Sequence, residues 1–175
     1  MVSKHVGSTY IWNSLGSIMN AAMSVVLFWA AMNYMGAYVG GIFSLAYEVG
    51  QQFLPLGAFE VRPCQATDLE EKYSFKTYCI ARFITVLLMF AGIIAYFSIT
   101  GTYGYSGLAV TLIASLKLFD AIEDVFPGAF QRIDRLDCAG KALFFRSFLT
   151  TASFCIGMFA TRDLLSACII CFVIS

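Results

Sequence analysis

The sequence predicts an all-α integral membrane protein, a polytopic bundle of about six transmembrane helices. Two observations lead to this fold class. The 175 residues are 59% hydrophobic and only 13% charged, with a mean hydropathy of +0.77, whereas soluble domains are about 45–50% apolar and about 25% charged. Long apolar stretches also alternate with short polar breaks, and nearly every Lys and Arg lies in every second break. Lipid is therefore the expected solvent for most of this chain.

Each expected helix is an apolar stretch between two polar breaks. A spanning helix needs about 20 mainly apolar residues, because the hydrocarbon core is about 30 Å thick and a helix rises about 1.5 Å per residue. The first stretch is too long for the core of a signal peptide, so we expect a permanent helix. The expected spans form one domain and cover residues of about 10–34, 38–59, 78–99, 105–126, 142–159 and 164–175.

The basic residues predict which breaks lie in the cytoplasm, because Lys and Arg concentrate in cytoplasmic loops. The breaks near residues 36 and 100–103 carry no charge, and the break before the last span carries one basic residue, Arg162. We therefore expect the N-terminus and the loops 60–77 and 130–141 to be cytoplasmic. Their basic residues are Lys4, Arg62, Lys72, Lys76, Arg132, Arg135 and Lys141.

Neither metal chemistry nor enzyme chemistry is indicated. Cys168 and Cys171 form a C-x-x-C within an apolar run, whereas zinc and redox sites need polar, accessible surroundings, so we expect the cysteines to be small buried hydrophobes. His5 is the single histidine, and no paired nucleophile and base can be assembled from the spans. The zero net charge gives no case for nucleic acid. We expect no enzyme, no cofactor and no metal, but a polar-lined bundle that moves a molecule.

Polar residues in the first two expected helices repeat at steps of three and four, which places them on one face. In the first helix, this face is formed by Asn13, Gly16, Ser17, Asn20 and Ser24, either as a close helix–helix contact or as a cavity wall. In the second helix, Glu48 lies about halfway along, followed by the amides at 51 and 52. Glu48 has no basic residue within a turn, so it either bonds to another helix or faces a cavity, and we favour the cavity.

The fourth expected helix is the least lipid-like. Lys117, Asp120 and Asp124 share one face, with Glu123 beside them, and a cation at this spacing can neutralise acids locally. Either the helix leaves the membrane near Phe119, or this face lines the cytoplasmic half of a cavity.

Several stretches carry a resemblance to a known family. They are Asn13–Ser17 (NSLGS), Gly41–Ser44 (GIFS), Val61–Asp68 (VRPCQATD) and Lys117–Phe126 (KLFDAIEDVF), with Arg135-Leu136-Asp137 beyond. From about Asn13 to Arg146 the chain resembles bacterial polysaccharide-biosynthesis membrane proteins. These are the O-antigen and capsule flippases of the multidrug/oligosaccharidyl-lipid/polysaccharide exporter superfamily. The resemblance implies a transporter of two six-helix lobes, of which this chain is the N-terminal lobe, apparently truncated, with the C-terminal lobe missing.

The resemblance also implies a function in lipopolysaccharide or capsule biosynthesis, in the bacterial cytoplasmic membrane with the N-terminus in the cytoplasm. The implied substrate is an undecaprenyl-pyrophosphate-linked oligosaccharide, moved by alternating access, and the implied partners are the lipid bilayer and a C-terminal lobe or second subunit. Arg132 and Arg135 are either a basic rim that meets the pyrophosphate or ordinary positive-inside anchors. The candidate residues of the substrate path are Asn13, Asn20, Glu48, Gln51, Gln52, Lys117, Asp120 and Asp124.

Two alternatives remain open at this point. One is a multidrug or small-solute exporter of the same superfamily, for which the path should be more aromatic, whereas an oligosaccharide path should be wide and wet. The other is a non-transporting membrane scaffold or a defunct fragment.

Overall fold

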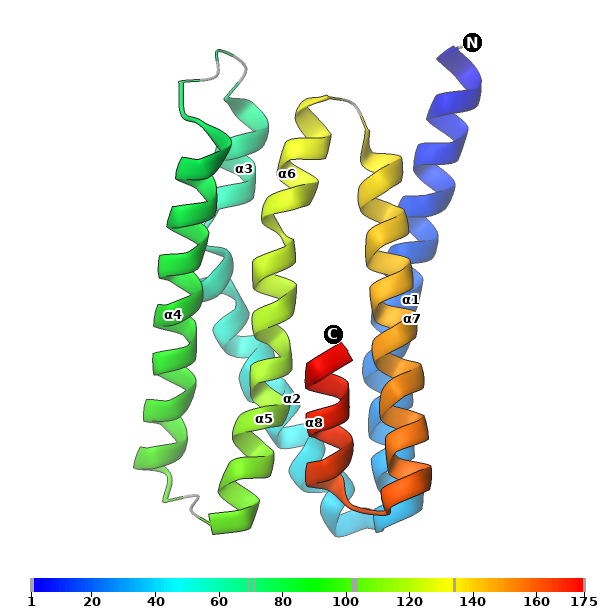
Figure 1. Cartoon of the computed structure of the whole chain (residues 1–175), viewed down its shortest axis with the longest axis vertical. Coiled ribbons are helices and arrows are strands. Elements are labelled where there is room, and N and C mark those ends of the chain that lie inside the picture. Colours follow the sequence, from blue (N-terminus) through cyan, green and yellow to red (C-terminus); the bar gives the residue numbers. More distant parts are fainter. Residues whose placement is uncertain (1, 69, 71, 102–103, 134, 175) are drawn as a thin grey trace.

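Every regular element among the described residues is a helix (Figure 1). The computed structural model describes residues 2–68, 70, 72–101, 104–133 and 135–174. The helices are α1 (Val2–Met35), α2 (Ala37–Ala58), α3 (Val61–Thr67), α4 (Phe75–Ile99), α5 (Gly104–Glu123), α6 (Val125–Arg132), α7 (Leu136–Thr161) and α8 (Leu164–Ile174). The all-α prediction is confirmed for this part of the chain.

Three of these helices are long and apolar enough to cross a membrane: Gly7–Met35 of α1, all of α4 and all of α7. Their outward side chains are apolar as well. On α4, for example, Phe83, Leu87 and Leu88 are half exposed or more. Exposing such an apolar surface to water costs free energy, so these helices indicate a membrane protein.

The remaining helices differ from those three in composition or length. Helices α2 and α5 have 22 and 20 residues and lie alongside α4, but they are not among the helices that are apolar enough along a membrane-spanning length. Helix α8 has 11 residues, which extend about 16 Å at about 1.5 Å per residue, about half of a hydrocarbon core. Of the six expected spans, the first, third and fifth are therefore supported. The second, fourth and sixth stay predictions.

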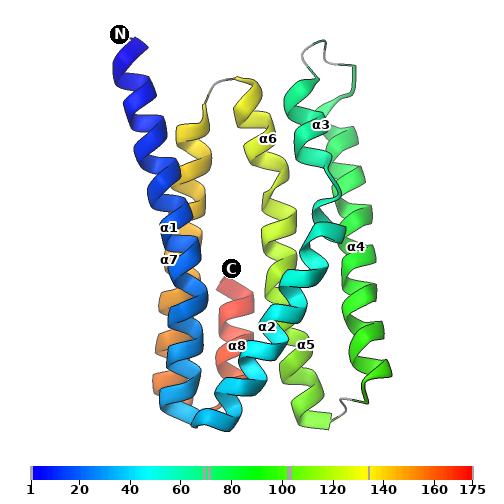
Figure 2. The same ribbon diagram turned by 180° about the vertical axis from the view of Figure 1, so that it is seen from behind.

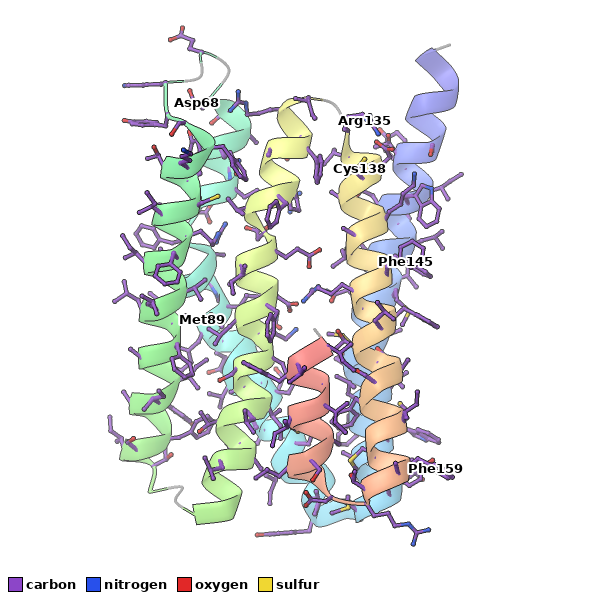
Figure 3. The ribbon with its side chains drawn as sticks, in the orientation of Figure 1. Asp68, Met89, Arg135, Cys138, Phe145 and Phe159 are labelled. Carbon is purple, nitrogen blue, oxygen red and sulfur yellow. The ribbon has the colours of Figure 1, made fainter. Side chains whose placement is uncertain are left out.

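The polar breaks alternate between the two ends of the bundle (Figure 1). The N-terminus, the α2–α4 connection and the α6–α7 connection lie at one end, and the turns at Gly36 and Arg162 lie at the other. Figure 3 places Asp68, Arg135 and Cys138 at the first end and Phe159 at the second. We call the first end the basic end, because its segments carry Arg62, Lys72, Lys76, Arg132, Arg135 and Lys141.

Close backbone contacts hold the helices in pairs. A Cβ on Gly140 of α7 would lie 2.5 Å from the carbonyl carbon of Trp12, and a Cβ on Gly16 of α1 would lie 2.7 Å from the Gly140 oxygen. A Cβ on Gly50 of α2 would lie 2.5 Å from the Ala114 oxygen of α5. Small residues permit such approaches in membranes. The bundle thus contains an α1–α7 pair and an α2–α5 pair, the latter flanked by α4.

These two pairs meet at the end opposite the basic end. In the view from behind, α1 and α2 join at the Gly36 turn and diverge toward the basic end (Figure 2). Helix α8 packs against α7 and α5, and its buried Cys168 joins a core that includes Phe43 and Phe154. Packing is therefore most complete away from the basic end.

Two expected features differ in the structure. The loops 60–77 and 130–141 contain the short helix α3 and the end of α6, which pack on each other. The expected fourth span to residue 126 is interrupted, because α5 ends at Glu123 and a turn at Asp124 precedes α6.

Candidate functional site

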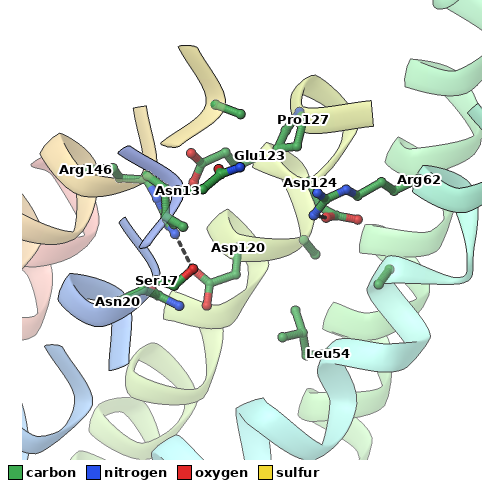
Figure 4. Close-up of a pocket in the computed structure, with 14 residues that line it drawn as sticks. Asn13, Ser17, Asn20, Leu54, Arg62, Asp120, Glu123, Asp124, Pro127 and Arg146 are labelled. Carbon is green, nitrogen blue, oxygen red and sulfur yellow. Dashed lines mark hydrogen bonds and ion pairs between the residues drawn. The ribbon is translucent and has the colours of Figure 1, made fainter. Parts of the chain in front are cut away.

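A cavity of about 530 Å³ lies where the two helix pairs diverge (Figure 4). It draws side chains from α1, α2, α3, α5, α6 and α7, and its wall combines charged and amide groups with apolar side chains in nearly equal measure. The described lining residues are Asn13, Ser17, Asn20, Leu54, Ala58, Arg62, Asp120, Ala121, Glu123, Asp124, Pro127, Ala139, Leu143 and Arg146.

The α1 wall supplies uncharged polar groups. Asn13, Ser17 and Asn20 follow each other at steps of four and three residues, so they share one face of α1. Gly16, between them, makes the close contact with Gly140 of α7. This face therefore has both features: Gly16 packs on α7 and Asn20 Oδ1 accepts a hydrogen bond of 3.4 Å from Ser147 Oγ of α7, and Asn13, Ser17 and Asn20 also line the cavity.

The α5–α7 wall is held by an arginine that bridges two carboxylates. Arg146 Nη2 lies 2.5 Å from Asp120 Oδ1, and Arg146 Nε forms an ion pair with the Glu123 carboxylate. Lys117 Nζ lies 2.8 Å from the other Asp120 oxygen and 4.4 Å from the centre of the Tyr47 ring. These pairs compensate the charges in an otherwise apolar interior, where an unpaired charge is costly.

The opposite wall is built around Asp124. Arg82 Nη2 of α4 lies 2.8 Å from Asp124 Oδ2, and Arg62 Nη1 of α3 lies 3.3 Å from Oδ1. Arg82 Nη1 also donates to the carbonyl oxygens of Gly57 and Ala58, at 2.8 and 2.6 Å. Arg82 thus ties the end of α2 to the α5–α6 turn. Its position near the end of α4 suggests a side chain that extends to the lipid headgroups, but it is 2% exposed.

The charges of the site nearly balance. Four cations pair with the three carboxylates of Asp120, Glu123 and Asp124. Hydrogen-bond donors and acceptors, and charges of both signs, therefore face the same cavity. Such a wall suits a ligand with many hydroxyl groups better than a bare ion, because hydroxyls both donate and accept.

The predicted path residues fall into three groups. Asn13, Asn20, Asp120 and Asp124 line the cavity. Lys117 is 4% exposed and reaches the cavity through Asp120. The residues predicted on the second helix lie outside the cavity wall, on an exposed stretch of α2, and these are Glu48, Gln51 and Gln52.

The two predicted rim arginines lie outside the cavity wall as well. Arg135 Nε lies 3.1 Å from Asp137 Oδ1, and Lys141 Nζ lies 3.8 Å from Oδ2 of the same carboxylate. Arg132 ends α6. Both arginines therefore lie at helix ends of the basic end, as positive-inside anchors would. Their binding to a pyrophosphate stays a prediction.

Sequence reasoning missed Arg146 as a site residue. Arg146 lies ten residues inside α7. The sequence does contain one signal for such a partner. Residues 120–124 include three acids, whereas the single cation beside them is Lys117. The excess negative charge therefore requires a cation from another helix.

Outside the cavity, Asp68 organises the connection between α3 and α4. Its carboxylate accepts hydrogen bonds from the backbone N–H groups of Tyr73 and Lys72 and from the Tyr78 hydroxyl, at 3.0, 2.9 and 2.8 Å. The Tyr73 and Lys72 bonds lower the pKa of Asp68 below its ordinary value, because they stabilise the charged form.

Comparison of the chain with protein-family models, curated proteins and solved structures finds no match in any of the three. The functional argument therefore depends on the cavity itself.

Proposed function

We propose that this chain is one lobe of a membrane transporter that moves a lipid-linked oligosaccharide by alternating access. In this proposal α2 and α5 also cross the bilayer, and the basic end faces the bacterial cytoplasm because it carries the Lys and Arg residues. The lobe works against a second lobe or subunit, and the cavity carries the hydrophilic headgroup while the lipid tail stays in the bilayer.

The observation that carries the proposal is a cavity of about 530 Å³ whose wall carries charged and amide groups, in a bundle whose helices α1, α4 and α7 expose mainly apolar side chains. Ionisable residues at membrane depth are costly and usually mark a substrate or ion pathway. Here the carboxylates and arginines come from four different elements and surround a cavity. Ion pairs with a purely structural role would not need such a cavity between them.

The composition of the wall favours sugars over drugs. No aromatic side chain occurs among the described lining residues, although the chain contains 17 Phe and 9 Tyr. Drug sites are lined mainly by apolar and aromatic groups. The cavity volume, however, lies within the range of about 300–1,000 Å³ typical of drug-sized ligands, so a small-solute exporter is the second candidate.

Reconstituted liposomes test the proposal. The complete chain is inserted into vesicles that contain an undecaprenyl-pyrophosphate-linked oligosaccharide with a fluorescent glycan, and an impermeant quencher is added outside. A flippase lets the inner-leaflet pool be quenched as well, whereas empty vesicles lose only the outer pool. A second set of vesicles holds a trapped fluorescent organic cation, whose release identifies a small-solute exporter. If neither probe moves, the transport proposal is wrong.

A matched pair of variants connects transport with the cavity. Asn20→Leu removes an amide from the wall, and we expect about tenfold slower transport, the equivalent of about one hydrogen bond. Val25→Leu changes an outward residue of the same helix that is 65% exposed, and we expect no effect. Equal rates for both variants would separate transport from this cavity.

A further inference from the structure

Helix α3 begins at a backbone conformation that its residues disfavour. Phe59 and Glu60 join α2 to α3, and both lie in the left-handed region, with φ of 36° and 53°. Glycine is the usual residue in this region, because a Cβ makes the conformation costly. Two consecutive residues with side chains therefore hold backbone strain at the junction between α2 and α3.

The contact of α3 with α6 buries polar atoms that have no partner. Gln65 of α3 is 0% exposed, and neither its Nε2 nor its Oε1 forms a hydrogen bond with any described residue. The amide lies against α6, since a Cβ on Gly128 would be 2.5 Å from Gln65 Oε1. A buried amide without partners has given up its hydrogen bonds to water. Separation of α3 from α6 would restore them.

An ion pair holds α3 across the same contact. Arg62 of α3 pairs at 3.3 Å with Asp124, which lies at the turn between α5 and α6 (Figure 4). The Arg62 side chain is 41% exposed, so water can take the place of the carboxylate. Asp124 keeps Arg82 at 2.8 Å when Arg62 leaves. Breaking this pair therefore leaves no buried charge without a partner.

The other end of α3 is attached to α4 instead of α6. Asp68 follows the last residue of α3, and its carboxylate accepts a hydrogen bond of 2.8 Å from the Tyr78 hydroxyl of α4. This attachment does not involve α6. Helix α3 can thus leave α6 while its Asp68 end stays in place.

We propose that α3 (Val61–Thr67) is a flap that turns about its Asp68 end, separates from α6 and opens a side entrance to the cavity. Arg62 lines the cavity together with Ala58 and Asp124, so the flap closes the wall between the ends of α2 and α5. The strained junction and the buried amide favour release of the flap, and the Arg62–Asp124 pair opposes it. The flap controls access for any ligand of the cavity, so the proposal goes beyond oligosaccharide transport and does not depend on it.

The reactivity of a thiol buried at the α3–α6 contact measures release of the flap. Val61 of α3 and Val125 of α6 belong to one small apolar cluster with Tyr78. Val125 is 3% exposed, so a Val125→Cys thiol should react with an impermeant maleimide only while α3 is away from α6. The reagent is added to inside-out vesicles.

Two features of the background keep this measurement specific. Cys64→Ser, Cys79→Ser and Cys138→Ser remove the exposed and partly buried thiols nearest to the contact. The native Cys168 is 0% exposed and lies in the main core, so it reports unfolding of the whole chain. Labelling of Cys168 at the same rate as Val125→Cys would overturn the proposal, because the flap would then not open by itself.

Two substitutions should change the labelling rate in opposite directions. Gln65→Leu removes the unpartnered amide at similar side-chain size, so it should stabilise the closed flap and slow labelling about tenfold. Arg62→Met removes the ion pair and should speed labelling about threefold. Arg135→Met, which removes an exposed pair elsewhere at the basic end, should leave the rate unchanged. Equal rates in all variants, or faster labelling with Gln65→Leu, would show that α3 is a fixed part of the wall.

A thiol inside the cavity tests whether the flap is an entrance. Asn20→Cys places a thiol on the cavity wall, and Gln65 is not among the described lining residues, so Gln65→Leu leaves that wall unchanged. We expect Gln65→Leu to slow the reaction of Asn20→Cys with a bulky impermeant maleimide several-fold and to leave the reaction with a small one unchanged. If the bulky reagent reacts equally fast with and without Gln65→Leu, or if both reagents slow alike, the flap does not control the cavity. No step measures transport, so a chain that moves no oligosaccharide can still meet every expectation for the flap.

Discussion

Arg146 is expected to be the most sensitive charged residue of the cavity. Its side chain is 15% exposed and pairs with Asp120 and Glu123, which are 13% and 19% exposed. Arg146→Met leaves Asp120 with Lys117 at 2.8 Å, whereas Glu123 loses the ion-pair partner that the described structure gives it. Removing one partner of a buried pair costs about 3–5 kcal/mol, and since Lys117 remains and the cavity admits water, we expect about 3 kcal/mol.

A double-mutant cycle separates the ion pair from general damage. Glu123→Gln alone should cost about 1 kcal/mol, because Arg146 keeps Asp120. The double variant should be less destabilised than the two single costs together imply, with a coupling energy of about 2 kcal/mol. As a control, Arg135→Met removes a pair in which the arginine is 49% exposed, and its cost should stay below about 1 kcal/mol.

The assay is the free energy of unfolding from SDS titration in mixed micelles, followed by tryptophan fluorescence, since the chain contains two Trp residues. The reasoning is refuted if Arg146→Met is as stable as the Arg135→Met control. It is also refuted if the Arg146 and Glu123 effects are additive, because no shared ion pair would then exist.

Two other predictions concern packing and pH. Gly140→Leu should lower the free energy of unfolding by about 3 kcal/mol or more, because its Cβ would lie 2.5 Å from Trp12 backbone, whereas the exposed Ala142→Leu should be neutral in the same SDS titration. The lowered pKa of Asp68 means that its contribution to stability is complete above the ordinary carboxyl pKa of about 3.9 and is lost as pH falls through the lowered folded value. Hydrogen exchange at the Tyr73 amide should therefore stay slow at pH 5, and Asp68→Asn should make it fast at every pH; slow exchange in that variant would refute the role of the carboxylate.

The long helices were predictable because their apolar stretches match the thickness of a bilayer, and α1, α4 and α7 follow from length and hydropathy alone. The placement of alternate breaks at one end also follows, since each long helix carries the chain from one end of the bundle to the other. The short helices α3 and α6 were not predictable, because 7 and 8 residues are too few to show a helical period.

The site was predictable in part. The spacing of Asn13 and Asn20 gives a shared face, and Asp120 and Asp124 follow from their charge within an apolar region. The partners could not be predicted, since Arg82 and Asp124 are 42 residues apart and only the packing of α4 against the α5–α6 turn brings them together. Glu48 shows the opposite case. Its spacing predicts a polar face of α2, but another face of α2 lines the cavity.

The water accessibility of Asn20 tests the account most directly. Asn20→Cys and Val25→Cys place thiols on opposite sides of α1, one on the cavity wall and one outward. In inside-out vesicles from a Cys64→Ser, Cys138→Ser background, an impermeant thiol reagent should label Asn20→Cys and not Val25→Cys, and intact cells should protect both. Labelling of neither position, or of both equally, would contradict a hydrated cavity that opens at the basic end.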